Sequence, residues 1–341
     1  MDTAYQPKFE RSAKLVRHLT EASSLSAWIG QQTVDVSWMA STQRDALVRQ
    51  AHYSTRIEGN PLTLPEVEAL AAGKDLAVEE RAKREVLNYF AALRWIWKRA
   101  PKQADERALL KLHKTLTLGT LPKNEAGEYK LKPNAVFANG RIIYKPPPPE
   151  AAPILTRALL NWINSAGTAD EHAVVVAGIA HHRLVSIHPF MDGNGRISRA
   201  LESWILYRKD FDTHHIFALD EFFEQDRNRY YLEIQKVRGN NDNLTSWLEY
   251  VSEGILQTLK KTRMRIQALR LKKPATKIIL LAKQERILQI LAQTPQIGGG
   301  ELARILNITR SHLSKLLRPL LNSGLIGKTG STKSSFYHLP E

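Results

Sequence analysis

Apolar residues recur along most of this chain at the three- and four-residue spacing of amphipathic helices. Long segments of this kind cover residues 151–165 and 244–271. Residues 173–180 are apolar at every position, which indicates a helix buried on all sides. A further helical segment, about 42–58, follows a capping-box pattern at Thr42 and is expected to end at Gly59. The pattern therefore predicts a mainly α-helical protein.

One short segment has the pattern of strands instead. Residues 135–138 and 141–144 are apolar or β-branched runs on either side of Asn139 and Gly140, which form the strongest two-residue hairpin signal. Four prolines at positions 146–149 follow, and proline cannot donate to a β-ladder. An isolated hairpin is marginally stable, so we expect this one to lean on helices or to receive a partner strand.

The C-terminal segment has the element order of a small winged helix-turn-helix domain. The pattern predicts helices over residues 276–292, 301–306 and 310–322, followed by two strands within residues 325–339. The third helix keeps its leucines on one face and leaves to solvent side chains that can reach DNA phosphates and base edges, namely Arg310, Ser311, Ser314, Lys315 and Arg318. A winged domain used for dimerisation or protein contact is the alternative.

Composition and charge change this picture in two ways. The 341 residues are 43% apolar and 24% charged, as in ordinary globular proteins, and the absence of cysteine excludes disulfides and thiolate metal sites. No apolar run is long enough to span a membrane and the N-terminal residues lack a signal-peptide pattern, so we expect a cytoplasmic protein without a membrane partner. The net charge of +15 is concentrated beyond residue 250, where 16 Lys and Arg face 4 Asp and Glu. This asymmetry favours an anionic partner for the C-terminal domain.

The residues between two buried helical segments carry the candidate chemistry. In this loop, HPFMDGNG over residues 188–195, Gly193 and Gly195 leave backbone N–H groups uncovered at a helix N-terminus, which favours an anion. Arg196 and Arg199 follow in the first turn of the next helix, predicted to begin near Arg196, and are expected to extend the cationic site outward over further phosphates. Asp192 is an oxygen ligand suited to Mg²⁺. His188 has the ordinary pKa of a general base.

The stretch HPFMDGNGRISR resembles the HPFx(D/E)GNGRxxR signature of the Fic family at every specified position. Similar stretches at residues 112–116, 126–130 and 228–238, together with the hairpin, extend the resemblance over most of residues 50–250. The resemblance implies a helical Fic core that transfers AMP from ATP to a Ser, Thr or Tyr hydroxyl of a target protein, with Mg²⁺, and releases pyrophosphate. Lys130 stands where the family often has Arg.

The resemblance also implies roles for individual residues. His188 is then the base and Asp192 the Mg²⁺ ligand, while Asn194 and the Gly193 and Gly195 amides hold the α-phosphate. Arg196 and Arg199 would hold the outer phosphates, and Tyr231 would wall the adenine pocket. The hairpin, with Ile142, Ile143 and Tyr144, resembles the flap that positions the target segment by strand pairing.

Residues 54–60, STRIEGN, raise an electrostatic question. Glu58 lies at the negative end of its helix dipole, and the residues three and four positions before it, Thr55 and Ser54, offer no cation. The stretch resembles the (S/T)xxxE(G/N) inhibitory motif of some Fic proteins, in which Ser54 and Glu58 share one helix face. The resemblance implies that Glu58 pairs with Arg199 and thereby excludes a productive ATP pose.

We therefore expect a mainly α fold, a helical Fic core with a β-hairpin flap followed by a small winged-helix domain. The expected boundaries are an N-terminal helical region over residues 1–100, a catalytic core over 101–272 and a winged domain over 276–341. Two alternatives stay open: a DNA-binding regulator whose core senses nucleotide, and transfer of another nucleotide or removal of AMP. A homodimer that hides or shares the inhibitory helix is a further hypothesis.

Overall fold

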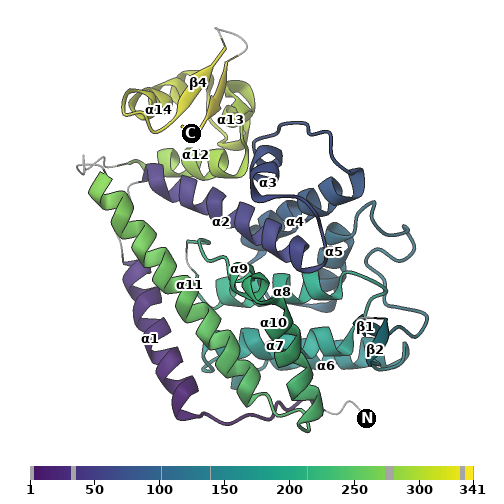
Figure 1. The fold of residues 1–341 in the computed structure, drawn as a ribbon. Coiled ribbons are helices and arrows are strands. Elements are labelled where there is room, and N and C mark those ends of the chain that lie inside the picture. Colours follow the sequence, from purple (N-terminus) through teal and green to yellow (C-terminus); the bar gives the residue numbers. More distant parts are fainter. Residues whose placement is uncertain are drawn as a thin grey trace.

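Two adjacent helices, α7 (Ala173–Ile187) and α8 (Asn194–Arg208), form the centre of the larger part of the molecule. The computed structural model describes residues 4–31, 36–100, 102–138, 140–212, 214–272, 280–330 and 335–340. Around the central pair lie α1 (Ala13–Gly30), α2 (Val36–Ile57), α3 (Leu64–Ala71), α4 (Glu80–Arg99), α5 (Glu106–Leu116), α6 (Ala151–Ile163), the 3₁₀ helix η1 (Ala166–Thr168), α9 (Asp220–Gln225), α10 (Arg227–Gly239) and α11 (Thr245–Lys272) (Figure 1).

The burial of α7 follows from its sequence, because an all-apolar helix has no face to give to water. Of its fifteen residues only Arg183 is not fully buried. The helix α11 approaches it closely at Gly178, whose carbonyl oxygen accepts a 2.7 Å hydrogen bond from Trp247 Nε1. Along the outer side α1 runs beside α11 (Figure 1). The prediction of a helix buried on all sides is thus confirmed.

The helix that carries Ser54 begins earlier than the capping-box pattern predicts. Thr42 lies inside α2, which starts at Val36, so the prediction of a start at Thr42 is wrong. No Gly or Pro interrupts residues 36–41, and the helix therefore continues through a Ser-Thr pair that would otherwise suit a cap. At the other end α2 stops at Ile57, and Gly59 adopts the expected left-handed conformation with φ 94°.

The predicted hairpin is present. Strands β1 (Val136–Ala138) and β2 (Arg141–Tyr144) pair antiparallel, and Gly140 has φ 74°, whereas Asn139 lies outside the described residues. Tyr144 fixes the hairpin to the helical body, because its hydroxyl donates to the Ser186 carbonyl at 2.8 Å and the Arg238 guanidinium stacks 3.5 Å from its ring centroid. Ile142 and Ile143 keep half and two-fifths of their surface exposed. The hairpin thus leans on helices, as one of the two expectations stated.

The C-terminal elements have a separate hydrophobic core of their own, built from leucine and isoleucine side chains. They are α12 (Ala282–Gln293), β3 (Ile297–Gly298), α13 (Gly299–Ile305), α14 (Arg310–Asn322), β4 (Gly327–Thr329) and β5 (Phe336–His338). The three strands pair in the order β3, β5, β4, so one more strand exists than the pattern predicts. The first helix begins at Ala282 rather than 276, because residues 280 and 281 are not helical; residues 273–279 lie outside those described.

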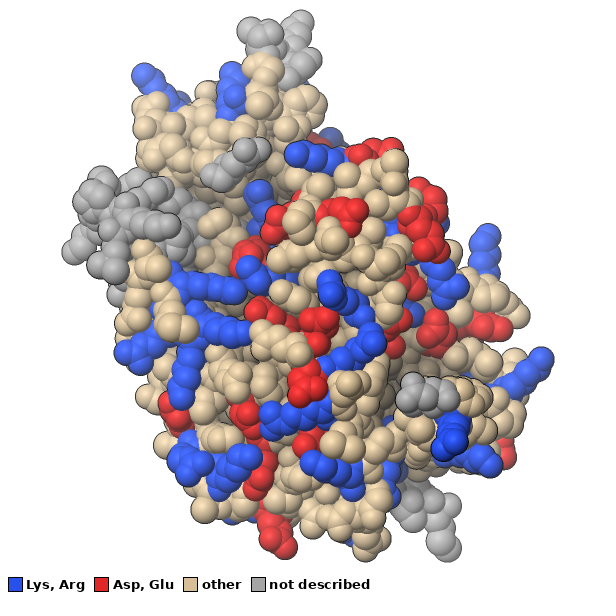
Figure 2. Space-filling view, viewed as in Figure 1, with Lys and Arg blue, Asp and Glu red and all other residues tan. Residues whose placement is uncertain are grey.

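The helix α12 packs against α2, so the two cores meet at the helix that carries Ser54 (Figure 1). On the face seen in Figure 2, Lys and Arg side chains are intermixed with Asp and Glu over the helical body. No helix within the described residues is long and apolar enough to cross a membrane.

Candidate active site

The site begins where α7 ends. His188 takes a left-handed conformation, with φ 51°, at the C-terminal cap of α7, and its backbone N–H donates to the Leu184 carbonyl. Its Nδ1 lies 3.3 Å from the Val185 carbonyl oxygen, which can only accept a hydrogen bond, so Nδ1 carries the proton of the neutral ring. Burial lowers the pKa of His188 from 6.5 to about 4. The ring is therefore neutral at pH 7, and no described residue donates a hydrogen bond to the lone pair of Nε2.

The loop after His188 is braced by its own side chains. The amide of Asn194 accepts from the Phe190 backbone N–H at 3.0 Å and donates to the Phe190 carbonyl at 2.8 Å. The Phe190 ring is fully buried and stacks on His113 with 3.7 Å between ring centroids. The Asn194 side chain is thus occupied with the loop backbone, and only its backbone N–H is left to face an anion.

The N-terminus of α8 forms a cradle of backbone donors. Gly193 caps the helix with φ 80°, and no described residue accepts from the backbone N–H groups of Asn194, Gly195 and Arg196. Gly195 permits a close approach, because a Cβ placed there would clash with Glu58 Oε1. The helix begins at Asn194, two residues earlier than predicted. The Glu58 carboxylate therefore lies against the positive end of α8.

Arg199 is the cation that faces Glu58. Its Nη2 donates to Glu58 Oε1 at 2.7 Å and to the Ser54 carbonyl at 2.9 Å, and its Nε donates to Ser54 Oγ at 2.8 Å. The Arg199 side chain is 1% exposed and that of Glu58 is 33% exposed. The pairing proposed from the sequence is present, and Ser54 in α2 and Glu58 just after it both reach the site. Hydrogen bonds between charged groups are about twice as strong as neutral ones.

Arg196 and Asp192 form a second charged group at the rim. Arg196 Nη2 donates to Asp192 Oδ2 at 3.3 Å, and its Nη1 lies 3.4 Å from Glu85 Oε1 on α4. Asp192 Oδ1 accepts from the Gly193 N–H at 2.6 Å, and the side chain is 48% exposed. Both arginines are buried, because neighbouring helices cover α8. That they extend the cationic site over further phosphates stays a prediction.

A buried polar network behind Arg199 was not foreseen from the sequence. Arg199 Nη1 donates to the Tyr230 hydroxyl at 3.3 Å, and that hydroxyl lies 2.9 Å from His181 Nε2. His181 Nδ1 lies 2.7 Å from Glu202 Oε2, and Asp220 Oδ1 lies 3.3 Å from Arg199 Nε. Burial lowers the pKa of His181 to about 3 and raises the pKa of Glu202 well above its usual range. These residues come from four separate helices, so no local sequence signal joins them.

Tyr231 contacts α2. Its hydroxyl donates to the Ile57 carbonyl at 3.0 Å, at the end of α2 just before Glu58, while 39% of its surface is exposed. That Tyr231 forms a wall of an adenine pocket stays a prediction. Lys130 is buried and its backbone N–H donates to the Pro189 carbonyl at 2.9 Å, while its Nζ donates to Asn134 Oδ1 at 2.8 Å.

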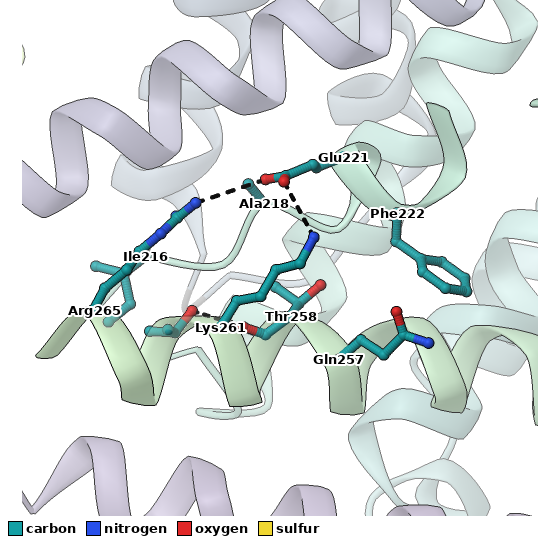
Figure 3. Close-up of a pocket in the computed structure, with 9 residues that line it drawn as sticks. Ile216, Ala218, Glu221, Phe222, Gln257, Thr258, Lys261 and Arg265 are labelled. Atoms are coloured by element: carbon teal, nitrogen blue, oxygen red, sulfur yellow. Dashed lines mark hydrogen bonds and ion pairs between the residues drawn. The ribbon is translucent and has the colours of Figure 1, made fainter. Parts of the chain in front are cut away.

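Other sequence candidates lie apart from this group. The five polar side chains of α14 are exposed on the surface of the C-terminal domain. A hollow between α9 and α11 is lined by paired charges, since Glu221 accepts from Lys261 Nζ at 3.2 Å and pairs with Arg265 at 4.0 Å (Figure 3). Its polar groups satisfy one another, unlike the free donors at the N-terminus of α8.

Comparisons with known proteins match two parts of the chain. Residues 103–206 match the model of the Fic/DOC family, and residues 280–326 match that of winged helix-turn-helix DNA-binding domains. The chain therefore carries a Fic/DOC domain and a C-terminal winged helix-turn-helix domain, with a mainly helical fold and small antiparallel sheets.

Among curated relatives, protein adenylyltransferase Fic of Drosophila yakuba is 28% identical over 222 residues, 64% of this chain and 42% of the relative. That of Culex quinquefasciatus is 28% identical over 74% of this chain and 47% of the relative. The chain thus spans about half the length of the curated relatives it matches.

Two solved structures share the fold. A Fic family protein from Desulfovibrio desulfuricans G20 is 22% identical, covers 98% of both chains and has a TM-score of 0.69. Fic-1, residues 134–508, from C. elegans is 22% identical over 75% of this chain and 74% of its own, with a TM-score of 0.65.

Proposed function

We propose that this protein is an adenylyltransferase that moves AMP from ATP to a Ser, Thr or Tyr hydroxyl of a target protein, or of itself. The observation that carries the proposal is the placement of His188, whose Nδ1 lies 3.3 Å from the Val185 carbonyl oxygen and whose Nε2 has no partner among the described residues. It precedes a helix N-terminus at which the backbone N–H groups of residues 194–196 have no described acceptor. The similarity to curated adenylyltransferases supports the same reaction.

In this reaction the target hydroxyl oxygen attacks the α-phosphorus of ATP, and its proton passes to His188 Nε2. The bond between the α-phosphorus and the bridging oxygen breaks, and pyrophosphate leaves. The backbone N–H groups of residues 194–196 would hold the α-phosphate, since the Gly193 N–H donates to Asp192 Oδ1. Arg196 and Arg199 would hold the outer phosphates. Catalysis of phosphoryl transfer depends mainly on such positioning and charge neutralisation.

Asp192 fits the role of Mg²⁺ ligand. Half of its carboxylate is exposed beside the cradle. No group of three or more candidate ligand side chains occurs among the described residues. Mg²⁺ commonly takes one or two carboxylates, with phosphates and water completing its shell, so a single Asp suits a metal that arrives with ATP. When bound, the ion neutralises phosphate charge.

We propose further that α2 restrains this activity. Glu58 lies at the positive end of α8 and pairs with Arg199, so it occupies a position that an outer phosphate of ATP needs. Release of Glu58 frees both the cradle and the guanidinium. Tyr231, which holds the end of α2, would also wall the adenine pocket, and the exposed Ile142 and Ile143 of the hairpin, with Tyr144 anchoring it, would align the target segment.

The reaction is tested by incubating the purified protein and candidate protein acceptors with ATP labelled at either the α- or the γ-phosphate. AMP transfer predicts protein-bound label from α-labelled ATP and none from γ-labelled ATP. Label from the γ-position alone would contradict the proposal. Parallel reactions with UTP and GTP, and with a pre-adenylylated acceptor, test transfer of another nucleotide and removal of AMP.

A second activity, DNA binding, is favoured by α14. Arg310, Ser311, Ser314, Lys315 and Arg318 are all exposed on this helix, whose leucine face is buried. We propose the winged domain, over residues 276–341, as a DNA-binding unit beside a Fic core over residues 101–272 and an N-terminal region over residues 1–100. If the protein is only a nucleotide-sensing regulator, it binds DNA without any need for His188. Light scattering at high concentration tests the homodimer hypothesis.

A further inference from the structure

Arg199 has a second carboxylate besides Glu58. Asp220, the first residue of α9, places Oδ1 3.3 Å from Arg199 Nε, and its side chain is only 3% exposed. The Ser54 hydroxyl also accepts from Arg199 Nε, at 2.8 Å. The guanidinium thus contacts two carboxylates, that of Glu58 at the end of α2 and that of Asp220 in the helical body.

The two carboxylates differ in how they are held. Glu58 follows the end of α2 and is one-third exposed, whereas Asp220 is enclosed by the helical body. A buried cation that loses its only counter-charge is strongly destabilised. If Glu58 were the only carboxylate on Arg199, its departure would leave such a charge inside the protein. Asp220 removes that obstacle, because it stays with Arg199 when α2 moves.

The remaining neighbours of Arg199 cannot take over this role. Tyr230 offers a neutral hydroxyl, and burial raises the pKa of its phenol far above the physiological range. Glu202 contacts His181 rather than Arg199, and burial raises the pKa of its carboxyl well above the usual range. Burial raises the pKa of Asp220 only to about 6, because the charge of Arg199 opposes the shift. Among the described residues, Asp220 is the other acidic group within 4 Å of the guanidinium besides Glu58.

We propose that Asp220 is a positioning residue that keeps Arg199 in place and charge-compensated, so that the same guanidinium can pass from Glu58 to a nucleotide phosphate. This inference rests on the proposed function for its consequence in catalysis. In the protein without nucleotide, Glu58 and Asp220 can each replace the other as the counter-charge of Arg199.

The test is a double-mutant cycle on the full chain without nucleotide. Glu58→Gln and Asp220→Asn each remove one charge and keep the shape of the side chain. Because either carboxylate alone can compensate Arg199, the loss in Tm of the double variant should exceed the sum of the two single losses by about 3 °C or more. Additive losses would overturn the assignment.

The matched control replaces another buried aspartate. Asp212 is 1% exposed and accepts from the backbone N–H groups of Ile216 and Phe217, so it has a structural role away from Arg199. Asp212→Asn combined with Glu58→Gln should give additive changes in Tm. If Asp220→Asn alone fails to fold, Arg199→Gln should restore folding, because it removes the charge that needs a partner. Failure of that rescue would also contradict the proposal.

A kinetic readout separates this inference from the proposed function. In the Asp220→Asn variant, Glu58 becomes the only carboxylate on Arg199 and inhibits more strongly. The ratio of the AMP-transfer rate with Glu58→Gly to the rate without it should then rise about tenfold in this background, corresponding to about 1.4 kcal/mol. Equal effects of Asp220→Asn on both rates would indicate a merely structural role. If no variant transfers AMP while the Tm cycle is non-additive, the proposed function fails and the role of Asp220 stands.

Discussion

The arginines of the two basic sites of this molecule differ in burial and in counter-charge. At the N-terminus of α8, Arg196 and Arg199 are buried and lie against the carboxylates of Asp192, Glu85, Glu58 and Asp220. On α14, the basic side chains are exposed and no described carboxylate lies within ion-pair distance of them. A buried arginine needs a counter-charge, which holds it in the single geometry that catalysis requires. An exposed arginine can change its conformation to contact the phosphates of a DNA backbone.

The comparison predicts that only the buried site depends on a base. We expect His188→Ala to lower AMP transfer by about 10²- to 10⁴-fold, because the hydroxyl proton then has no positioned acceptor. DNA binding should not change. His18→Ala is a suitable control, since His18 is buried and contacts Ser252 on α11, away from the loop. AMP transfer at the full rate in the His188→Ala variant would contradict the role of His188 as the base.

The carboxylate on the buried arginine should also be removable. Glu58→Gly breaks the 2.7 Å contact with Arg199 and clears the N-terminus of α8, so we expect AMP transfer to rise about 10- to 100-fold, as for loss of a charged hydrogen bond. Glu68→Gly on the exposed face of α3 serves as the control. An unchanged rate in the Glu58→Gly variant would exclude restraint by α2.

The exposed site should respond to salt and to single charge changes. Lys315→Ala is expected to weaken DNA binding severalfold and to lower the slope of log affinity against log salt by about one, because one phosphate contact is lost. The AMP-transfer rate should stay unchanged. Fluorescence anisotropy with duplex DNA at several salt concentrations measures both quantities. An unaltered salt slope would favour the winged domain as a protein-contact or dimerisation module.

The smallest expected effect is that of pH on the AMP-transfer rate that depends on His188. Because burial lowers the pKa of His188 from 6.5 to about 4, the ring stays neutral as pH falls from 7.5 to 5.5. The transfer rate of the Glu58→Gly variant should therefore fall less than twofold, whereas a base with the ordinary pKa would lose about tenfold. The same shift means that neutral His188 contributes stability above pH 6.5 that is lost as pH falls towards 4.

The sequence predicted those features that depend on neighbouring residues. The helix over residues 310–322 has the predicted bounds, because Thr309 caps it and Gly324 follows it, and the hairpin is set by its apolar runs. The strand β3 was missed because two residues become a strand only by pairing with β5, far along the chain. The early start of α2 was missed because a Ser-Thr pair is tolerated inside a helix as well as at its cap.

In the candidate site too, residues close together in the sequence were predicted, and residues from separate helices were not. His188, Asp192 and the glycines lie together in the sequence and were found together, and the Glu58 partner came from the family resemblance. Asp220, His181 and Glu202 join the site from three different helices, and each has an unremarkable local context. The burial of Arg196 and Arg199 could not be predicted from the sequence, because it depends on how other helices cover α8.

Intact-mass spectrometry after incubation with Mg²⁺ and ATP measures AMP transfer, its dependence on His188 and its restraint by Glu58 in one experiment. The unchanged protein, Glu58→Gly, and Glu58→Gly combined with His188→Ala are compared, with a protein acceptor present in parallel reactions. Transfer by His188 under restraint by Glu58 predicts an AMP adduct that is strong for Glu58→Gly, weaker for the unchanged protein and absent from the double variant. Equal adducts on the unchanged and Glu58→Gly proteins, or an adduct that survives loss of His188, would contradict it.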